Sequence, residues 1–169
     1  MSVTFRTAGV EDAAALAELG AASFTATFGH LYEPADLALF LDNHRVERWL
    51  AELSDPGFAV RVAEEAGAMV GYAKLGPPQL PLAPRGRAAE LRQLYVLAPW
   101  HGRGVAQTLM EWVIAEARRD GAGHLYLSVF INNARARRFY ERYGFEEEGR
   151  YVFMVGTHAD EDIVMRLTL

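Results

Sequence analysis

The pattern of strands and helices in the sequence predicts an α/β fold, with a mixed, mostly antiparallel sheet of about seven strands flanked by about four helices. Some strand-like runs are joined by short turns, which is typical of antiparallel hairpins, whereas others are joined through a helix, which is typical of parallel pairing. The chain has 169 residues, of which 51% are hydrophobic and 23% charged, so it can bury a real core. We expect one domain over residues 1–169.

The first part of the chain predicts a strand followed by two helices. Residues 3–8 are β-rich, and an Ala/Leu-rich helix follows with Glu11 and Asp12 in its first turn, where acids suit the helix dipole. Pro34 stands where a second helix can begin. Apolar residues at helical spacing continue to the stop at residues 55–57, and we expect this second helix to be broken.

A hairpin and a long loop come next. Residues 58–64 and 69–75 are β-rich runs separated by a glycine-containing turn, which predicts an antiparallel pair. Residues 76–87 hold four prolines and two glycines, so they predict a loop, which we expect to cover the active face. The remaining predicted elements are a strand at 90–97, a helix after Pro99 that ends at Gly121, a strand at 124–129, a helix at 133–143 and a closing hairpin of 145–155 and 162–169.

The composition argues against several classes of function. A formal net charge of −5 without any Lys/Arg block argues against nucleic-acid binding. The lack of cysteine excludes disulfides and a thiolate nucleophile and favours a cytoplasmic setting. The five histidines lack the paired spacing of a zinc helix, so no metal is predicted. No apolar run approaches the length that spans a bilayer, and we expect no membrane association.

The most informative stretch is Leu94–Gln107, in which a strand ends, a glycine turn follows and a helix begins. The first amides of a helix are unpaired and carry the positive end of its dipole, so they attract anionic phosphate oxygens. Gly102 and Gly104 would let a diphosphate approach the backbone, and Arg103 can add a charge-assisted bond. The alternative is that the two glycines only make a turn.

This stretch resembles motif A of the GCN5-related N-acetyltransferase (GNAT) superfamily, in which Gln/Arg-x-x-Gly-x-Gly/Ala binds the pyrophosphate of acetyl-CoA. His101, Gly104 and Ala106 occupy that frame, with His101 in place of the usual Gln or Arg. The resemblance implies that the backbone of the preceding strand pairs with the pantetheine arm like an added strand. The donor-binding residues that it implies are Leu94, Tyr95, Val96, Gly102, Arg103, Gly104, Val105, Ala106 and Gln107.

A second stretch, Asn133–Phe145, resembles motif B of the same family, with an Asn, an Ala and a Phe-Tyr pair before a Gly-Phe. The resemblance implies that Asn133 lies at the cofactor and that Tyr140 is the general acid. The chemistry requires such a group, because a phenol within hydrogen-bond distance can protonate the departing thiolate. Taken alone, Tyr140 would be a half-buried amphipathic aromatic residue.

A general base is also needed, since an aliphatic ammonium has no lone pair with which to attack. Glu90 is the candidate, because it begins the strand that leads into motif A and period-two alternation puts it on the face of Leu94 and Val96. Its alternative role is a solvated carboxylate at a strand end. Ser128 stands where the related ribosomal-alanine acetyltransferases carry their glutamate base, which makes peptide N-termini a less favoured acceptor.

The acceptor is less well defined than the donor. In the family it lies against the first helices and variable loops, here residues 24–43 and 76–87, where Glu33, Asp36 and Asp42 would attract a cation. A short likeness to bacterial polyamine and small-amine acetyltransferases suggests a small-molecule amine, among which polyamines are candidates. Three alternatives stay open: a sensor that binds acyl-CoA without turnover, a protein or peptide acetyltransferase, and transfer of an acyl group longer than acetyl. Chain pairing in the family suggests a homodimer, for which the final hairpin offers an edge.

Overall fold

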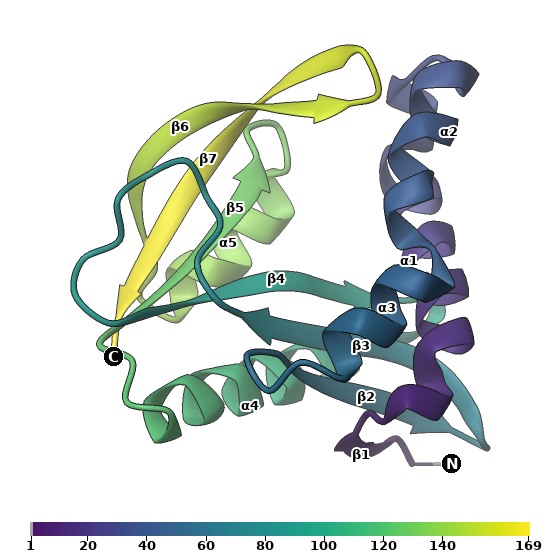
Figure 1. Cartoon of the computed structure of the whole chain (residues 1–169), viewed down its shortest axis with the longest axis horizontal. Coiled ribbons are helices and arrows are strands. Elements are labelled where there is room, and N and C mark those ends of the chain that lie inside the picture. Colours follow the sequence, from purple (N-terminus) through teal and green to yellow (C-terminus); the bar gives the residue numbers. More distant parts are fainter. Residues whose placement is uncertain (1) are drawn as a thin grey trace.

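A computed structural model describes residues 2–169, and it contains one seven-stranded sheet with the order β1-β2-β3-β4-β5-β7-β6 (Figure 1). The strands are β1 (Thr4–Thr7), β2 (Ala59–Glu65), β3 (Ala68–Gly76), β4 (Ala88–Val96), β5 (His124–Phe130), β6 (Glu146–Val155) and β7 (His158–Thr168). The helices are α1 (Ala13–Phe28), α2 (Pro34–Leu41), α3 (Val46–Leu53), α4 (Val105–Arg119) and α5 (Ala134–Arg142). The predicted α/β class and mixed sheet are confirmed.

The predicted broken helix is two helices, α2 and α3, separated by a 3-10 turn at Asp42–His44. The described residues therefore contain five α-helices where about four were expected. The closing hairpin is tighter than predicted, because only residues 156 and 157 separate the end of β6 at Val155 from the start of β7 at His158. None of the helices within residues 2–169 combines the length and the apolar character needed to cross a membrane.

The sheet has a single parallel junction, between β4 and β5, and every other described strand pair is antiparallel. This junction pairs only Ala88–Glu90 with His124–Tyr126. Beyond it, β4 continues to Val96 along β3, while β5 continues to Phe130 along β7. The two strands diverge towards their carboxyl ends, as Figure 1 shows. Their pairing ends at Glu90 and Tyr126, and the unpaired region beyond these residues is called the opening below.

Helices cover both faces of the sheet. On one face, α4 packs on β3, β4, β5 and β7 through a fully apolar cluster that includes Leu109, Met110 and Val113. On the other face, α1 and α3 pack on β2 and β3 around Leu16, Trp49 and others. Both clusters anchor β4, with Leu94 and Val96 in the first and Tyr95 in the second. The strand that borders the opening is therefore held from both sides.

Strand β4 contains a β-bulge that changes which face Glu90 occupies. Lys74 of β3 is paired with Gln93 and the next residue of β3 with Leu91, so Arg92 is an extra residue in β4. Leu91 consequently packs in the same cluster as Leu94 and Val96, and Glu90 points to the opposite face. The prediction that Glu90 shares the face of Leu94 and Val96 is wrong, because strict alternation cannot account for an inserted residue.

A buried ion pair joins α3 to the sheet. Lys74 of β3 is 6% exposed, and its Nζ lies 2.5 Å from the Oε2 of Glu52 and 4.4 Å from the centre of the Trp49 ring. Burial lowers the pKa of Lys74, and the hydrogen bond to Glu52 opposes that change. A buried ammonium that lost this carboxylate would keep its desolvation cost without a partner.

We therefore expect Glu52→Gln to lower the free energy of unfolding by about 3 kcal/mol, measured by urea denaturation. The matched control is Glu47→Gln on the same helix, since the Glu47 side chain is 77% exposed. That variant is expected to change the free energy by no more than about 0.5 kcal/mol. Equal losses in the two variants would contradict the role given to the buried pair.

Candidate active site

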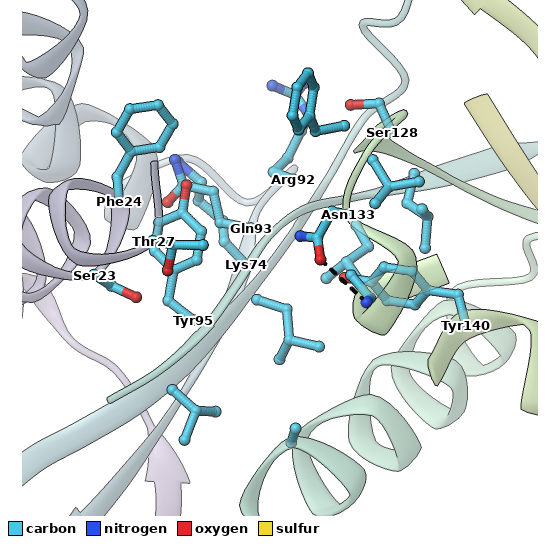
Figure 2. A pocket seen from close by; sticks show the side chains of 18 of the residues that line it. Ser23, Phe24, Thr27, Lys74, Arg92, Gln93, Tyr95, Ser128, Asn133 and Tyr140 are labelled. Atoms are coloured by element: carbon cyan, nitrogen blue, oxygen red, sulfur yellow. Dashed lines mark hydrogen bonds between the residues drawn. The ribbon is translucent and has the colours of Figure 1, made fainter. Parts of the chain in front are cut away.

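A cavity of about 840 Å³ occupies the opening between β4 and β5. Its walls come from α1, α2, α3, β3, the proline-rich loop, β4, the turn before α4, the start of α4, β5, α5 and the β6–β7 hairpin. In Figure 2, Asn133 and Tyr140 lie on one side and Ser23, Phe24 and Thr27 on the other. The sequence-predicted site residues that line it are Glu90, Leu94, Tyr95, Val96, Gly102, Gly104, Val105, Ala106, Gln107, Asn133 and Tyr140.

The turn before α4 depends on two glycines with left-handed backbone conformations. Gly102 has a φ of 74° and Gly104, the N-cap of α4, a φ of 81°, and both values strain any residue with a Cβ. The first helical hydrogen bond runs from the Thr108 amide to the Gly104 carbonyl. The preceding amides of α4 therefore have no helical acceptor and border the cavity. This arrangement suits an anionic group such as a diphosphate.

The side chains beside these glycines fix the turn to the rest of the fold. Arg103 lies 3.1 Å from Glu65 of β2, which also accepts a 2.9 Å hydrogen bond from the indole of Trp100. The structure therefore does not bring the Arg103 side chain into the cavity, although the sequence suggested a phosphate contact. His101 bridges the Val96 carbonyl at 2.6 Å and the Arg135 guanidinium at 3.0 Å, and so links β4 to α5.

Tyr140 enters the cavity from α5. Its ring packs against Phe139 and Phe145, with ring centres 5.4 and 5.8 Å away, and burial raises its pKa to about 12. The phenol is therefore protonated at neutral pH and can donate a proton or a hydrogen bond. Asn133 caps the same helix, since its Oδ1 accepts a 3.3 Å hydrogen bond from the Ala136 amide (Figure 2).

Glu90 lies at the point where β4 and β5 part and is 7% exposed. Its Oε1 accepts hydrogen bonds from the Gln79 amide at 2.8 Å and the Leu80 amide at 3.1 Å, while Oε2 lies 3.4 Å from Arg92. Burial raises the pKa of Glu90, and these three contacts oppose the rise. The carboxylate thus fastens the proline-rich loop over the cavity and also borders the cavity itself.

The far end of the cavity is aromatic and acidic. The acids that the sequence suggested are elsewhere: Asp36 accepts a 2.7 Å bond from the Thr157 amide, and Glu33 and Asp42 do not line the cavity. Asp160 and Asp162 of β7 line it instead. The sequence analysis missed both aspartates. A signal was present, because Ile163, Met165 and Leu167 alternate on the core face of β7 and Asp162 therefore lies on the opposite face. The aromatic lining of this end is Phe24, Phe28, Tyr32, Phe40, Phe130, Tyr151 and Phe153.

No group of three histidine, cysteine or carboxylate side chains suited to a metal ion occurs among residues 2–169. The cavity instead joins an anion-binding helix start, a protonated phenol and buried carboxylates in one continuous space. A helix start with free amides beside a protonated phenol is the combination that group transfer from a diphosphate-bearing donor requires.

Comparison with known proteins gives the family. The model of the Acetyltransferase (GNAT) family matches residues 15–145. An uncharacterized N-acetyltransferase of Mycobacterium tuberculosis is 37% identical over 155 residues, covering 91% of this chain and 96% of the relative. The chain therefore belongs to the GNAT acetyltransferase family and is an acetyl-CoA-dependent N-acetyltransferase.

Two further proteins extend the comparison. The L-amino acid N-acetyltransferase AaaT of Escherichia coli is 33% identical over 127 residues, with 70% of this chain and 75% of that protein covered. The crystal structure of the PaiA N-acetyltransferase from Thermoplasma acidophilum in complex with coenzyme A superposes with a TM-score of 0.81. It is 20% identical, with 100% of both chains covered, and thus shows the same fold.

Replacement of Gly104 tests the anion-binding turn. We expect Gly104→Ala to cost about 1 kcal/mol of stability through its positive φ and to weaken coenzyme A binding by about tenfold or more, measured by calorimetry. Gly67→Ala is the matched control, because Gly67 has a φ of 79° and open space around it, outside the cavity lining. It should lose similar stability but keep its affinity for coenzyme A. Equal affinity in both variants would count against the turn as the diphosphate site.

Proposed function

We propose that the protein transfers the acetyl group of acetyl-CoA directly to a primary amine of a small molecule, with both substrates in one cavity. The observation that carries this proposal is the continuity of the cavity from the start of α4, past Tyr140, to the aromatic and acidic end. An amine held at that end would reach the thioester without a covalent acyl-enzyme. Polyamines and other small amines are the candidate acceptors, and residues 1–169 are proposed to act as one domain.

The donor end follows from the backbone. The diphosphate would bind the free amides at the start of α4, from Gly104 to Gln107, where the helix dipole favours anions. The pantetheine arm would lie along Leu94–Val96, because none of the described strands pairs with β4 on that side beyond Glu90. A backbone amide near Val96 would polarise the thioester carbonyl, and Asn133 borders the same space.

The proton transfers follow from two side chains. Glu90 is proposed to remove a proton from the ammonium through water, which frees the nitrogen lone pair for attack on the carbonyl carbon. When the C–S bond breaks, the thiolate leaves with the bonding pair, and Tyr140 is proposed to supply its proton. The raised pKa of the buried Glu90 brings this carboxylate closer to neutral pH, which makes it a better base than a solvated acid.

The alternatives make different demands on the site. A sensor that binds acyl-CoA needs the glycine turn but no acid near the sulfur, whereas Tyr140 lines this cavity and is protonated. A peptide acceptor needs an open groove for a chain, whereas Gln79, Leu80 and Pro81 of the loop held by Glu90 form part of the cavity wall. We place the protein in the cytoplasm on its lack of cysteine, and we keep a homodimer through the edge strand β6 as a prediction.

Tyr140→Phe separates enzyme from sensor. We expect kcat for acetyl transfer to fall by about a hundredfold while the Kd for coenzyme A stays within about twofold, because only the proton donor is removed. The measurement is thiol release from acetyl-CoA with a panel of amines, beside calorimetry on the same sample. Tyr143→Phe, on the same segment but outside the cavity lining, is the control and should keep kcat. An unchanged kcat in Tyr140→Phe would contradict the proposal that Tyr140 is the general acid.

Glu90→Gln tests the base through the pH profile. A base works only when deprotonated, so wild-type kcat/KM should rise as pH passes through the raised pKa of Glu90. The glutamine can still accept the amides of Gln79 and Leu80, so the loop should stay in place. We expect kcat/KM to fall by about a hundredfold and the acidic limb of its pH profile to disappear. A variant that keeps this limb would show that another group is the base.

A further inference from the structure

Asp162 is a buried carboxylate that faces the cavity and takes no part in the mechanism above. It lies on β7 opposite Phe130 of β5 and Tyr151 of β6, and it is 7% exposed. The next residue, Ile163, is fully buried in the apolar cluster under α4, so Asp162 points to the other face, into the acceptor end of the cavity.

Among residues 2–169, no lysine, arginine or histidine forms an ion pair with Asp162. The cationic side chains on the same hairpin are paired with other acids: Arg150 with Glu147 and Glu161, and His158 with Asp160. A carboxylate buried without a counter-ion is costly, because it loses hydration and gains no opposing charge. The described part of the protein thus leaves a negative charge that a ligand can neutralise.

The groups that face Asp162 reinforce this charge. Asp160 of β7 is an acid in the same cavity, and Tyr32, which donates a hydrogen bond to Asp160, and Tyr151 are neutral phenols. The cations that line the cavity on α3, β3 and β4 are paired with other acids: Arg48 and Lys74 with Glu52, and Arg92 with Glu90. Burial raises the pKa of Asp162 to about 6, the charge of Asp160 raises it further, and hydrogen bonding by Tyr151 opposes both. Asp162 is therefore largely ionised at neutral pH, without a cation beside it.

The distance from the reaction centre suits a second charge on the acceptor. Ser128 borders the cavity on β5 opposite Val164, and Asp162 is two residues further along β7. Such diagonal neighbours lie roughly 7–8 Å apart. Tyr151 spans part of this gap, since its hydroxyl lies within hydrogen-bond distance, 3.1 Å, of the Ser128 hydroxyl. An amine near Ser128 and a cation at Asp162 would thus belong to one molecule with a short linker.

Aromatic rings line the cavity that holds both positions. Phe24 and Phe40 pack with their ring centres 4.2 Å apart, and Phe40 packs on Phe153 at 5.6 Å. Their faces provide an apolar surface for methylene groups and a favourable electrostatic environment for an ammonium. The acids at this end would repel a carboxylate, so an α-amino acid fits it less well.

We propose that Asp162 binds a second cationic group of the acceptor, so that the enzyme selects aliphatic diamines and polyamines over monoamines and amino acids. This inference rests on the proposed acetyl transfer to small amines and names the residue that sets its selectivity. The reacting amine lies near Glu90 and Ser128, and the second ammonium lies against Asp162 and the aromatic wall.

The test compares kcat/KM for putrescine and for n-butylamine, which share a four-carbon chain but differ in the second ammonium. We expect the wild-type protein to prefer putrescine by about tenfold or more, and Asp162→Asn to reduce that preference to about twofold or less. Glu161→Gln removes the same charge one residue away, where the side chain is 51% exposed, and should keep the preference. Equal reduction in both variants, no preference in the wild type or a preference for amino acids would overturn the proposal.

Thermal unfolding gives a second measurement, which distinguishes an Asp162 that binds the acceptor from one that only stabilises the fold. Because the pKa of Asp162 is raised in the folded protein, its ionised form destabilises the fold at about pH 8, and this cost disappears below about pH 4. Asp162→Asn should therefore raise the unfolding midpoint at the higher pH and leave it unchanged at the lower. A lower midpoint at both pH values would instead mark Asp162 as a structural hydrogen-bonding group.

The proposed acetyl transfer and the proposed role of Asp162 can be tested independently. Binding of coenzyme A without turnover of any amine would contradict the proposed function. Calorimetry of putrescine against the protein saturated with coenzyme A still tests Asp162, since this binding needs no chemistry. Binding that Asp162→Asn weakens by about tenfold supports the inference, and absent or unchanged binding contradicts it.

Discussion

The site depends on the early end of the parallel pairing between β4 and β5. Three residue pairs join the strands, and beyond Glu90 and Tyr126 each strand follows a different neighbour. A sheet edge inside the fold leaves backbone N–H and C=O groups without hydrogen-bond partners. This costs free energy unless a ligand or water forms those hydrogen bonds. An extended amide chain such as pantetheine can do so by acting as one more strand. The separation that interrupts the sheet is thus what creates the cavity.

The charges around this opening are arranged along its length. The start of α4 borders the cavity with free amides and the positive end of its dipole, and the carboxylates of Glu90, Asp160 and Asp162 line the same cavity. In the proposed reaction the helix start would hold the diphosphate. The buried Tyr140 of this cavity is neutral and protonated. An anionic donor and a cationic acceptor would therefore enter opposite ends of one cavity, each attracted to its own end, and meet near the phenol.

Much of the fold and of the candidate donor site could be predicted from the sequence, because the informative patterns lie in contiguous stretches. The glycine turn, the helix that follows it and the segment around Tyr140 are contiguous stretches, so their structure could be predicted from neighbouring residues alone. The face of Glu90 was not predictable, because the bulge at Arg92 appears only when β4 is paired with β3. The Arg103 side chain was likewise predicted to contact phosphate. In the structure it donates a hydrogen bond to Glu65, which lies 38 residues earlier in the chain on β2. Asp162 was missed for the same reason, because its importance comes from neighbours on other strands and from a missing counter-ion.

The most direct test of the account is a crystal structure of the protein with coenzyme A. The account predicts that the pantetheine amides bond to the backbone of Leu94–Val96, that the diphosphate rests on the amides of Gly104–Gln107, and that the sulfur lies within hydrogen-bond reach of the Tyr140 hydroxyl. A coenzyme A bound outside the opening between β4 and β5, or a sulfur separated from Tyr140 by another side chain, would contradict it.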